Sequence, residues 1–330
     1  DIIKEFVEAF REEGLKVGLY YSLIDWHHPD FTIDFLHPLH FHEDAEELNK
    51  TRDMKKYAQY MRDQVRELLT NYGKIDIMWF DYSYNKEGSY RPPTAKVWMK
   101  GKGKDDWESE KLNDLIRSIQ PDIIINNRMD IEQDIWTPEQ YVPQSWLKHP
   151  KTGELVTWEA CHTFSGSWGY HRDESTWKSP ELLIDILINT VSCGGNLIMN
   201  VGPTARGEFD SRAEDALNVF AKWMKYNSRS IYNCTMAEPE FKAPRGTRLT
   251  QSEDGKRLYI HLIEYPYAFL EFEGLGDKID YAQFLHDGSE ILYTVGTVDH
   301  FSEARTKKDG LVAFKIPQHV PEMIVPVIEV

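Results

Sequence analysis

Apolar residues follow two different spacings along the first 200 positions of the chain. At the N-terminus they recur every three or four positions, which is the spacing of one face of an amphipathic helix, at Ile2, Ile3, Phe6, Val7 and Phe10. Gly14 comes next, and the continuous apolar run at residues 17–21 has the length of a buried strand. The pattern therefore predicts a helix that ends near Gly14 and a strand that follows it.

The same order of helix and strand recurs along the chain. Further helical spacings cover residues 54–69, 112–119 and 182–191. Each of these segments is followed by a short apolar run, at residues 75–80, 122–126 and 196–201, and another short run at residues 156–159 also predicts a strand. Continuous apolar strands that alternate with helices are typical of a parallel sheet covered on both faces.

This order predicts the α/β class, and within it a TIM-like (β/α) barrel whose chemistry lies at the carboxyl ends of the strands. A complete barrel has about eight strands, so about three N-terminal strands are expected to be missing from the five predicted here. The alternative is an open doubly wound sheet. No Gly-x-Gly-x-x-Gly motif follows any predicted strand, which argues against the cofactor-binding form of that fold.

The pattern changes after a last helical spacing at Leu217, Phe220, Trp223 and Met224. Short alternating segments, such as residues 257–262 and 291–295, are separated there by turns rich in Asp and Gly. Alternation of this kind predicts a C-terminal antiparallel β-sandwich. We therefore expect two domains, a partial barrel at residues 1–236 and a sandwich at residues 237–330.

Charge and composition narrow the classes of partner. The net charge of −16, without any Lys/Arg-rich run, argues against nucleic acid and anionic lipid, so neutral ligands are expected. No apolar run approaches the ~20 residues of a membrane span. The three cysteines, Cys161, Cys193 and Cys234, are widely spaced, which argues against a disulfide framework and a thiolate metal site. Compartment and oligomeric state stay open.

Asp81 is the first candidate for chemistry. It follows the predicted strand at residues 75–80, so its side chain is expected at the barrel rim, with Trp79 on the same face of the strand. Arg128 follows the next predicted strand and is expected at the same rim. A guanidinium favours the ionised form of a nearby carboxyl group and can also bind hydroxyl groups through its planar fork. An aspartate at a strand end also commonly caps a loop, so both interpretations of Asp81 stand at this point.

A second carboxylate lies in the predicted loop Thr137-Pro138-Glu139-Gln140, beside Trp136. A general acid needs mobility and partly apolar surroundings, and this loop offers both, although a glutamate after proline in a loop is often simply solvated. Two carboxylates at one rim are what glycoside hydrolysis requires.

A metal site has weak support. His37, His40 and His42 are closely spaced, but Pro38 breaks regular geometry between them, and no second group of ligands is evident in the sequence. We expect neither a metal nor an organic cofactor.

Six short motifs, in one order along the chain, resemble those of the glycoside hydrolase family 29 α-L-fucosidases. They are Gly18-Leu19-Tyr20-Tyr21-Ser22 with Asp25-Trp26, Trp79-Phe80-Asp81, Asn126-Asn127-Arg128, Trp158-Glu159, Ser167-Trp168-Gly169-Tyr170, and Leu197-Ile198-Met199-Asn200-Val201-Gly202-Pro203. The resemblance covers roughly residues 1 to 235, and the β-rich tail agrees with the C-terminal sandwich of the family.

The resemblance implies a retaining exo-hydrolase that releases terminal α-L-fucose by double displacement, with Asp81 as the nucleophile. In such enzymes the two carboxyl groups lie about 5 Å apart. Glu139 matches the loop that supplies the acid/base, and Glu159 is its rival. The positions that match sugar contacts are Tyr20 or Tyr21, Trp79, Arg128 and Trp168. The implied partner is a fucosylated oligosaccharide or glycoconjugate.

One departure from the family pattern leaves alternatives open. The family carries an upstream strand that ends in Lys-His-His-Asp-Gly-Phe, whose histidines hold fucose hydroxyls, and that motif does not occur in these 330 residues. His27 and His28 match a later loop, so we do not assign them that role. The alternatives are a catalytically impaired, glycan-binding remnant of such an enzyme and a retaining barrel glycosidase for another sugar.

Overall fold

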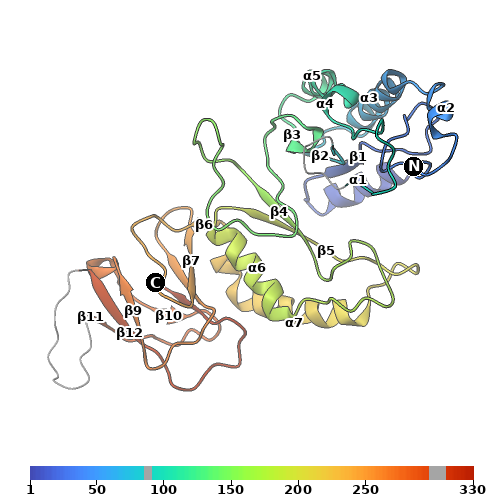
Figure 1. Ribbon diagram of the computed structural model, residues 1–330. Coiled ribbons are helices and arrows are strands. Elements are labelled where there is room, and N and C mark those ends of the chain that lie inside the picture. Colours follow the sequence, from blue (N-terminus) through green and yellow to red (C-terminus); the bar gives the residue numbers. More distant parts are fainter. Residues whose placement is uncertain (85–90, 297–309) are drawn as a thin grey trace. The chain divides into compact units, whose positions relative to one another are not determined.

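The computed structural model describes residues 1–84, 91–296 and 310–330, drawn as the coloured ribbon in Figure 1. The chain divides into two compact units, Asp1–Thr137 and Pro138–Val330.

The first unit alternates helices with parallel strands. Its elements are α1 (Ile2–Glu12), β1 (Gly18–Ser22), α2 (Ala45–Asn49), α3 (Met54–Asn71), β2 (Ile77–Asp81), α4 (Lys104–Trp107), α5 (Ser109–Ile119), β3 (Ile124–Ile125) and the 3₁₀ turn η1 (Asn127–Met129). Aspartates cap the first and third helices, since the Asp1 side chain accepts from the backbone N–H of Lys4 and the Asp53 side chain from that of Lys55. The three helices and three strands predicted from the apolar spacing in this region are all present.

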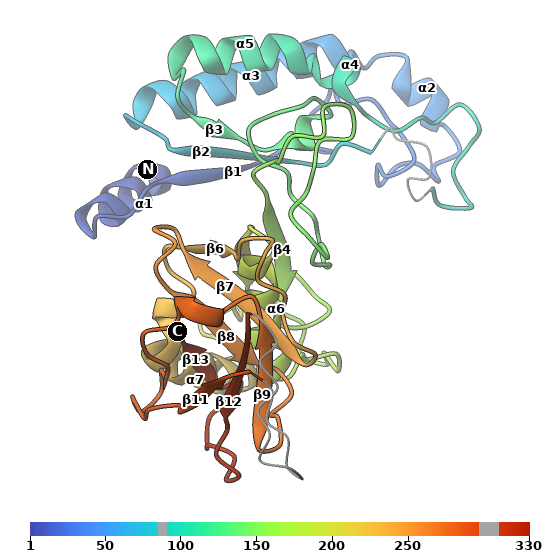
Figure 2. The same cartoon turned by 90° about the vertical axis from the view of Figure 1, so that its left-hand side faces the viewer.

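The sheet of the first unit has the order β1-β2-β3, and both pairs of neighbours are parallel. Helices α3 and α5 lie side by side on one of its faces, as Figure 2 shows. Buried side chains from the sheet and these helices, such as Met61, Met78, Phe80 and Ile116, belong to one hydrophobic core. Burial alternates along β2, where Met78 and Phe80 are buried and Trp79 is only partly buried, so these helices cover the Met78 and Phe80 face of the strand.

The second unit begins with a parallel pair of strands and continues into antiparallel sheets. Its elements are β4 (Glu159–Thr163), α6 (Pro180–Ser192), β5 (Asn196–Asn200), α7 (Ser211–Asn227), η2 (Ser228–Ser230), β6 (Cys234–Met236), β7 (Thr247–Ser252), β8 (Leu258–Leu262), β9 (Phe269–Glu273), η3 (Gly276–Lys278), β10 (Gln283–Phe284), β11 (Tyr293–Val295), β12 (Leu311–Lys315) and β13 (Val327–Glu329). Strands β4 and β5 pair in parallel.

One predicted strand is displaced. Residues 156–159 were expected to form it, but β4 begins at Glu159 and ends at Thr163. The residues before it belong to a hairpin, because the N–H of Val156 donates to the carbonyl of Leu147 over 3.0 Å. Apolar character alone did not separate this hairpin from the strand that follows it.

The antiparallel strands form a five-stranded sheet, β10-β13-β8-β7-β6, and a three-stranded sheet, β11-β12-β9. One hydrophobic core contains side chains of both sheets, among them Ile260 and Ile328 from the first and Phe272 and Phe314 from the second. The other face of the five-stranded sheet packs against α6 and α7, since Tyr259 of β8 belongs to the same core as Trp223 of α7. Strand β8 is therefore buried along its whole length.

The predicted domain boundary stays a prediction. Strand β6, the first of the antiparallel strands, ends at Met236, next to the boundary proposed at residue 237, whereas the two compact units divide between Thr137 and Pro138. Across the ranges that the structure describes, no helix combines the length and the apolar character needed to cross a membrane.

His261 of β8 is fully buried in the second unit. Its Nε2 lies 2.9 Å from Thr250 Oγ1, and because that hydroxyl donates to the carbonyl of Ser230, the histidine must be the donor. Its Nδ1 finds no hydrogen-bond partner among the described residues. Burial lowers the pKa of His261 to about 3, and the charge of Arg248 acts in the same direction.

This environment predicts acid sensitivity. The unfolded chain takes up a proton on His261 below about pH 6.5, whereas the folded chain does so only near pH 3, so the free energy of unfolding falls as the pH drops between these values. At about pH 4.5 the loss due to this one group should be roughly 2–3 kcal/mol. Urea denaturation at about pH 7 and 4.5 should show a smaller loss for His261→Gln than for the wild type. Equal losses in both proteins would contradict this assignment.

Candidate active site

Strands β1 and β2 bring two aromatic side chains and one acidic side chain to neighbouring positions. They pair in parallel with Tyr20 opposite Trp79 and Ser22 opposite Asp81. The rings of Tyr20 and Trp79 are stacked, with centroids 5.6 Å apart and planes 22° from parallel. Because side chains alternate along a strand, Trp79 and Asp81 share one face of the sheet while Phe80 is buried on the other.

The carboxylate of Asp81 accepts hydrogen bonds from three groups of the first unit. Oδ1 accepts from Arg128 Nη1 over 2.8 Å and from the backbone N–H of Tyr82 over 2.9 Å, and Oδ2 accepts from the Tyr20 hydroxyl over 2.9 Å. Tyr82 adopts a left-handed backbone conformation with φ 78°, which is uncommon for a residue with a side chain. The carboxylate is thus held in one orientation by its neighbours on both oxygens.

Arg128 is itself fixed on three sides. Its Nε donates to Thr137 Oγ1 over 2.8 Å and its Nη2 to the Thr137 carbonyl over 3.2 Å, while its guanidinium lies 4.5 Å from the centre of the Trp79 ring. The side chains of Arg128 and Asp81 are only 18% and 19% exposed, so their attraction is screened by water less than that of a surface pair. The structure therefore joins Asp81, Arg128, Trp79 and Tyr20 in one cluster at the C-terminal ends of the strands.

Two supporting residues of this cluster were not singled out from the sequence. In the sequence Thr137 is only a neighbour of Glu139, yet in the structure it orients Arg128. Asn126 is buried, and its side-chain amide both accepts from the N–H and donates to the carbonyl of Phe80, each over 2.9 Å. This amide joins β2 to the chain just beyond the two-residue strand β3, which positions the turn η1 that carries Arg128. Its place in the Asn126-Asn127-Arg128 motif was the available signal.

The side chains of Tyr20 and Tyr21 lie on opposite faces of the sheet that contains β1. Tyr20 lies with Asp81, and burial together with the Asp81 charge raises its pKa, so its hydroxyl stays protonated and acts as a donor. The Tyr21 hydroxyl instead donates to Gln64 Oε1 on α3 over 2.6 Å, and its ring packs edge-on against Phe80. Of the two sugar-contact candidates, the structure therefore places only Tyr20 beside the carboxylate.

A hollow of about 590 Å³ opens where β1 and β2 end. It is lined by Ser22, Ile24, Asp25, Trp26, His27, His37, Pro38, Leu39 and Tyr82. Two of these aromatic side chains, Trp26 and Tyr82, are 39% and 48% exposed. The volume lies within the range of about 300–1,000 Å³ that is usual for small-molecule sites.

The second unit carries the remaining candidates, beginning with Glu139. Residues Pro138 and Gln140 form backbone hydrogen bonds of 2.9 Å with Cys161 of β4, so Glu139 runs alongside the middle of that strand as an added parallel segment. Glu139 is exposed. Glu159, its rival, is half-buried and is the first residue of β4, at the N-terminal end of the strand.

Trp168 lies in a loop that contacts the last residue of β5 and the segment just after it. Asn200 Nδ2 donates to the Trp168 carbonyl over 2.6 Å. A Cβ atom on Gly202 would lie 2.5 Å from backbone atoms of Gly169 and Tyr170, so this position accepts glycine alone without displacement of the loop. The Trp168 side chain is 42% exposed. The motifs at residues 167–170 and 197–203 are therefore in direct contact in the folded chain.

The histidines of the first unit show no arrangement typical of a metal site. Residues 1–84, 91–296 and 310–330 contain no group of three or more His, Cys, Asp or Glu side chains that could hold a metal ion. The His37 Nδ1 accepts from the backbone N–H of Leu39 over 3.0 Å, and the His40 ring contacts the His37 carbonyl over 2.9 Å. These side chains stabilise the loop between β1 and α2.

Comparison with known families gives one clear match. The model of the Alpha-L-fucosidase family matches residues 1–229. Among curated proteins, the plasma alpha-L-fucosidases of Pongo abelii and Homo sapiens are both 30% identical over 243 residues, which is 70% of this chain and 45% of theirs. The chain thus spans just under half the length of these relatives.

Solved structures agree with this match. Alpha-L-fucosidase isoenzyme 1 from Paenibacillus thiaminolyticus is 34% identical, with a TM-score of 0.82 over 100% of this chain and 75% of its own. An alpha-L-fucosidase from Bacteroides thetaiotaomicron, 23% identical, has a TM-score of 0.75 over 100% of this chain and 70% of its own, which supports the fold. The predicted fold class, a partial (β/α) barrel followed by an antiparallel β-sandwich, is confirmed.

Proposed function

Because the chain belongs to the α-L-fucosidase family, we propose that its protein is a retaining exo-glycoside hydrolase that releases terminal α-L-fucose from glycans. The observation that carries the proposal is the Asp81 carboxylate at the carboxyl end of β2, held by Arg128, Tyr20 and the Tyr82 backbone. Barrel enzymes place their reacting groups at this end of the strands.

We assign the attack to Oδ2 of Asp81, since Oδ1 accepts two hydrogen bonds and Oδ2 only one. In the first step Oδ2 bonds to the anomeric carbon of fucose while the bond to the leaving oxygen breaks, and a general acid gives that oxygen its proton. In the second step the same group removes a proton from water, the water oxygen attacks the anomeric carbon, and Asp81 departs. Two inversions give overall retention.

We propose Glu139 as this acid/base. Its exposed side chain lies beside the middle of β4, nearer the C-terminal end of that strand than Glu159, which begins it. The proposed sugar contacts are Tyr20, Trp79 and Arg128 from the first unit and Trp168 from the second. Tyr21 is left out of this set, because its hydroxyl bonds to Gln64 on the other face of β1.

The proposed substrate is a fucosylated oligosaccharide or glycoconjugate, and no cofactor takes part in the two steps. Release of 4-nitrophenol from 4-nitrophenyl α-L-fucoside, with α-L-fucose as the first anomer seen by NMR, is the test. First formation of the β anomer would contradict the retaining mechanism. Fucose binding without release would leave only a glycan-binding role, and preference for another aryl glycoside would point to a different sugar.

Tyr20→Phe should lower kcat/KM by about 10- to 100-fold, because it removes one hydrogen bond to a charged carboxylate, worth about 1.5–3 kcal/mol. Most of the loss should fall on kcat, since this hydroxyl orients the nucleophile. Tyr21→Phe is the matched control, as it removes a hydroxyl from the neighbouring residue that bonds to Gln64 instead. Equal losses in the two variants would contradict the role given to Tyr20.

A further inference from the structure

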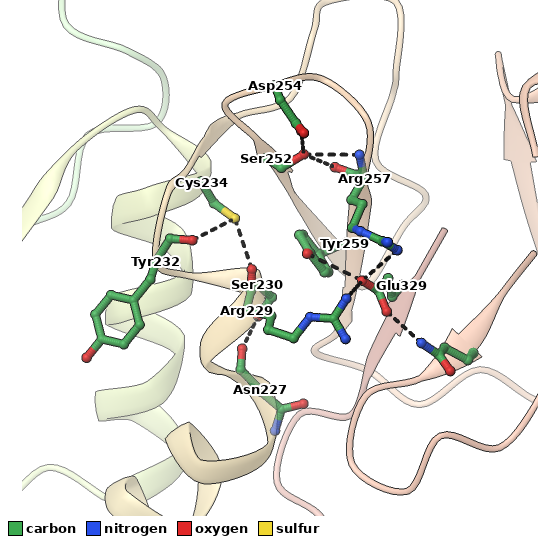
Figure 3. Close-up of polar contacts among 11 residues, drawn as sticks. Asn227, Arg229, Ser230, Tyr232, Cys234, Ser252, Asp254, Arg257, Tyr259 and Glu329 are labelled. Atoms are coloured by element: carbon green, nitrogen blue, oxygen red, sulfur yellow. Dashed lines mark hydrogen bonds and ion pairs between the residues drawn. The ribbon is translucent and has the colours of Figure 1, made fainter.

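A second hollow lies in the C-terminal part of the second unit. It has a volume of about 530 Å³ and is lined by Ser228, Arg229, Tyr232, Asn233, Ser252, Glu253, Asp254, Arg257 and Tyr259. Figure 3 shows the polar contacts among most of these residues, which come from η2 and the segment between η2 and β6, the end of β7, the turn between β7 and β8, and β8. None of them takes part in the mechanism proposed above.

A buried carboxylate holds the two arginines that line this hollow. Glu329 is 2% exposed, and its Oε1 accepts from Arg229 Nη2 and from Arg257 Nη1, the latter over 3.1 Å. Its Oε2 accepts from Gln283 Nε2 over 2.7 Å. The arginine side chains are 54% and 53% exposed, so each guanidinium is anchored by one N–H group while other N–H groups face solvent.

The segment that carries Arg229 is fixed by its own side chains. The Cys234 thiol donates to the carbonyls of Arg229 and Tyr232, and Ser230 Oγ donates to the Asn227 carbonyl over 2.7 Å (Figure 3). Burial raises the pKa of Cys234 to about 11, so this thiol keeps the proton that it donates. The hydrogen-bond donors of the hollow are therefore pre-organised.

The turn between β7 and β8 supplies hydrogen-bond acceptors to the lining of this hollow. Asp254 Oδ1 accepts from Ser252 Oγ over 2.6 Å and from the backbone N–H of Lys256 over 3.1 Å, which holds its carboxylate at the turn between β7 and β8. The backbone N–H of Glu253 donates to the Asn233 carbonyl over 2.9 Å, and this bond ties the turn to the rim. Tyr232, also at the rim, is 67% exposed.

The charges that line the hollow cancel. Arg229 and Arg257 contribute two positive groups to the lining, and Glu253 and Asp254 contribute two negative groups. Glu329, which pairs with both arginines, is buried and is not part of this lining. An anion would meet the carboxylates and the net charge of −16 of the chain, and a cation would meet the guanidiniums. A ligand whose hydroxyl groups both donate and accept, and whose C–H face can lie on an aromatic ring, fits the lining.

A neighbouring hollow of about 450 Å³ shares Asp254 and Arg257 and is also lined by Lys278, Tyr281 and Gln283. We propose that the two hollows form a binding site for an uncharged saccharide of at least two sugar units, held by Arg229, Arg257 and Asp254 with Tyr232 at its rim. Binding of a saccharide at this site involves no chemical reaction, so the proposal does not depend on the proposed fucoside hydrolysis.

The test is a glycan array with the intact protein, scored only on glycans without fucose so that catalytic binding does not contribute. Neutral glycans should bind, and binding should resist an increase in NaCl because no net charge is neutralised. Tyr232→Ala and Arg229→Gln should each weaken the apparent affinity for the best glycan by at least about tenfold, as aromatic and arginine anchors do elsewhere.

Tyr267→Ala and Arg245→Gln are the matched controls. Both residues are exposed in the same unit and line neither hollow, so the affinity should stay unchanged. Thermal unfolding of each variant separates loss of binding from loss of fold, and Tyr232→Ala keeps the Glu329 ion pairs intact. The proposal is overturned if no neutral glycan binds, if sulfated or sialylated glycans bind preferentially, or if the controls and the test variants lose affinity alike.

Discussion

Replacement of Asp81 by glycine is expected to lower the rate on an aryl α-L-fucoside by at least about three orders of magnitude. The variant lacks the oxygen that bonds to the anomeric carbon, but it keeps Arg128 anchored on Thr137 and Trp79. Glycine also leaves a space where the carboxylate was. Sodium azide should enter that space, attack the anomeric carbon from the same side, and restore part of the activity.

The product identifies the role of the residue. Azide replaces only the first of two inversions, so NMR should show fucosyl azide of the β configuration, inverted relative to the substrate. Asp122→Gly is a suitable control, because this exposed aspartate lies in the turn before β3, at the opposite end of the strands. Wild-type rates in Asp81→Gly, or an α-configured azide, would rule out Asp81 as the nucleophile.

The cluster around Asp81 was predictable because it depends on local rules. A carboxylate after one parallel strand and a guanidinium after the next must meet at one edge of the sheet, and the alternation of side chains places Trp79 on the face of Asp81. The choice between Tyr20 and Tyr21 did not follow from the sequence. It depends on the register of β1 against β2, which sets Tyr20 opposite Trp79.

Support from distant segments was less predictable. Thr137 lies nine residues after Arg128, and only the path of the loop brings its hydroxyl to the guanidinium. Gly202 belongs to a sequence motif, but the reason for glycine there, a close approach to the backbone of Gly169 and Tyr170, exists only in the folded chain. A strand was predicted at residues 156–159, but Val156 pairs with Leu147 in a hairpin and β4 begins only at Glu159. Sequence patterns thus predicted most of the elements and the cluster around Asp81, while contacts between loops required the structure.

Glu139→Gln is expected to lower the rate by about 10²- to 10⁴-fold on substrates whose leaving group needs a proton, such as fucosyl oligosaccharides. The amide keeps the size of the carboxyl group but cannot protonate the leaving oxygen. An aryl fucoside with a dinitrophenolate leaving group departs without a proton, so formation of the covalent intermediate on it should be nearly unaffected. Its hydrolysis then lacks the general base, and azide should restore turnover with a product of retained configuration.

The comparison with Glu159→Gln decides between the two glutamates. Glu159 begins β4 and is half-buried, whereas chemistry in this fold class occurs where strands end, so its replacement should affect stability more than the rate on either substrate. A bell-shaped profile of kcat/KM against pH should lose its high-pH limb in Glu139→Gln, because that limb reports ionisation of the general acid, and should keep it in Glu159→Gln. The opposite result would be leaving-group dependence and loss of the high-pH limb in Glu159→Gln. Glu159, at the start of β4, would then be the proton donor, and the segment that contains Glu139 would serve only to extend the sheet beside Cys161.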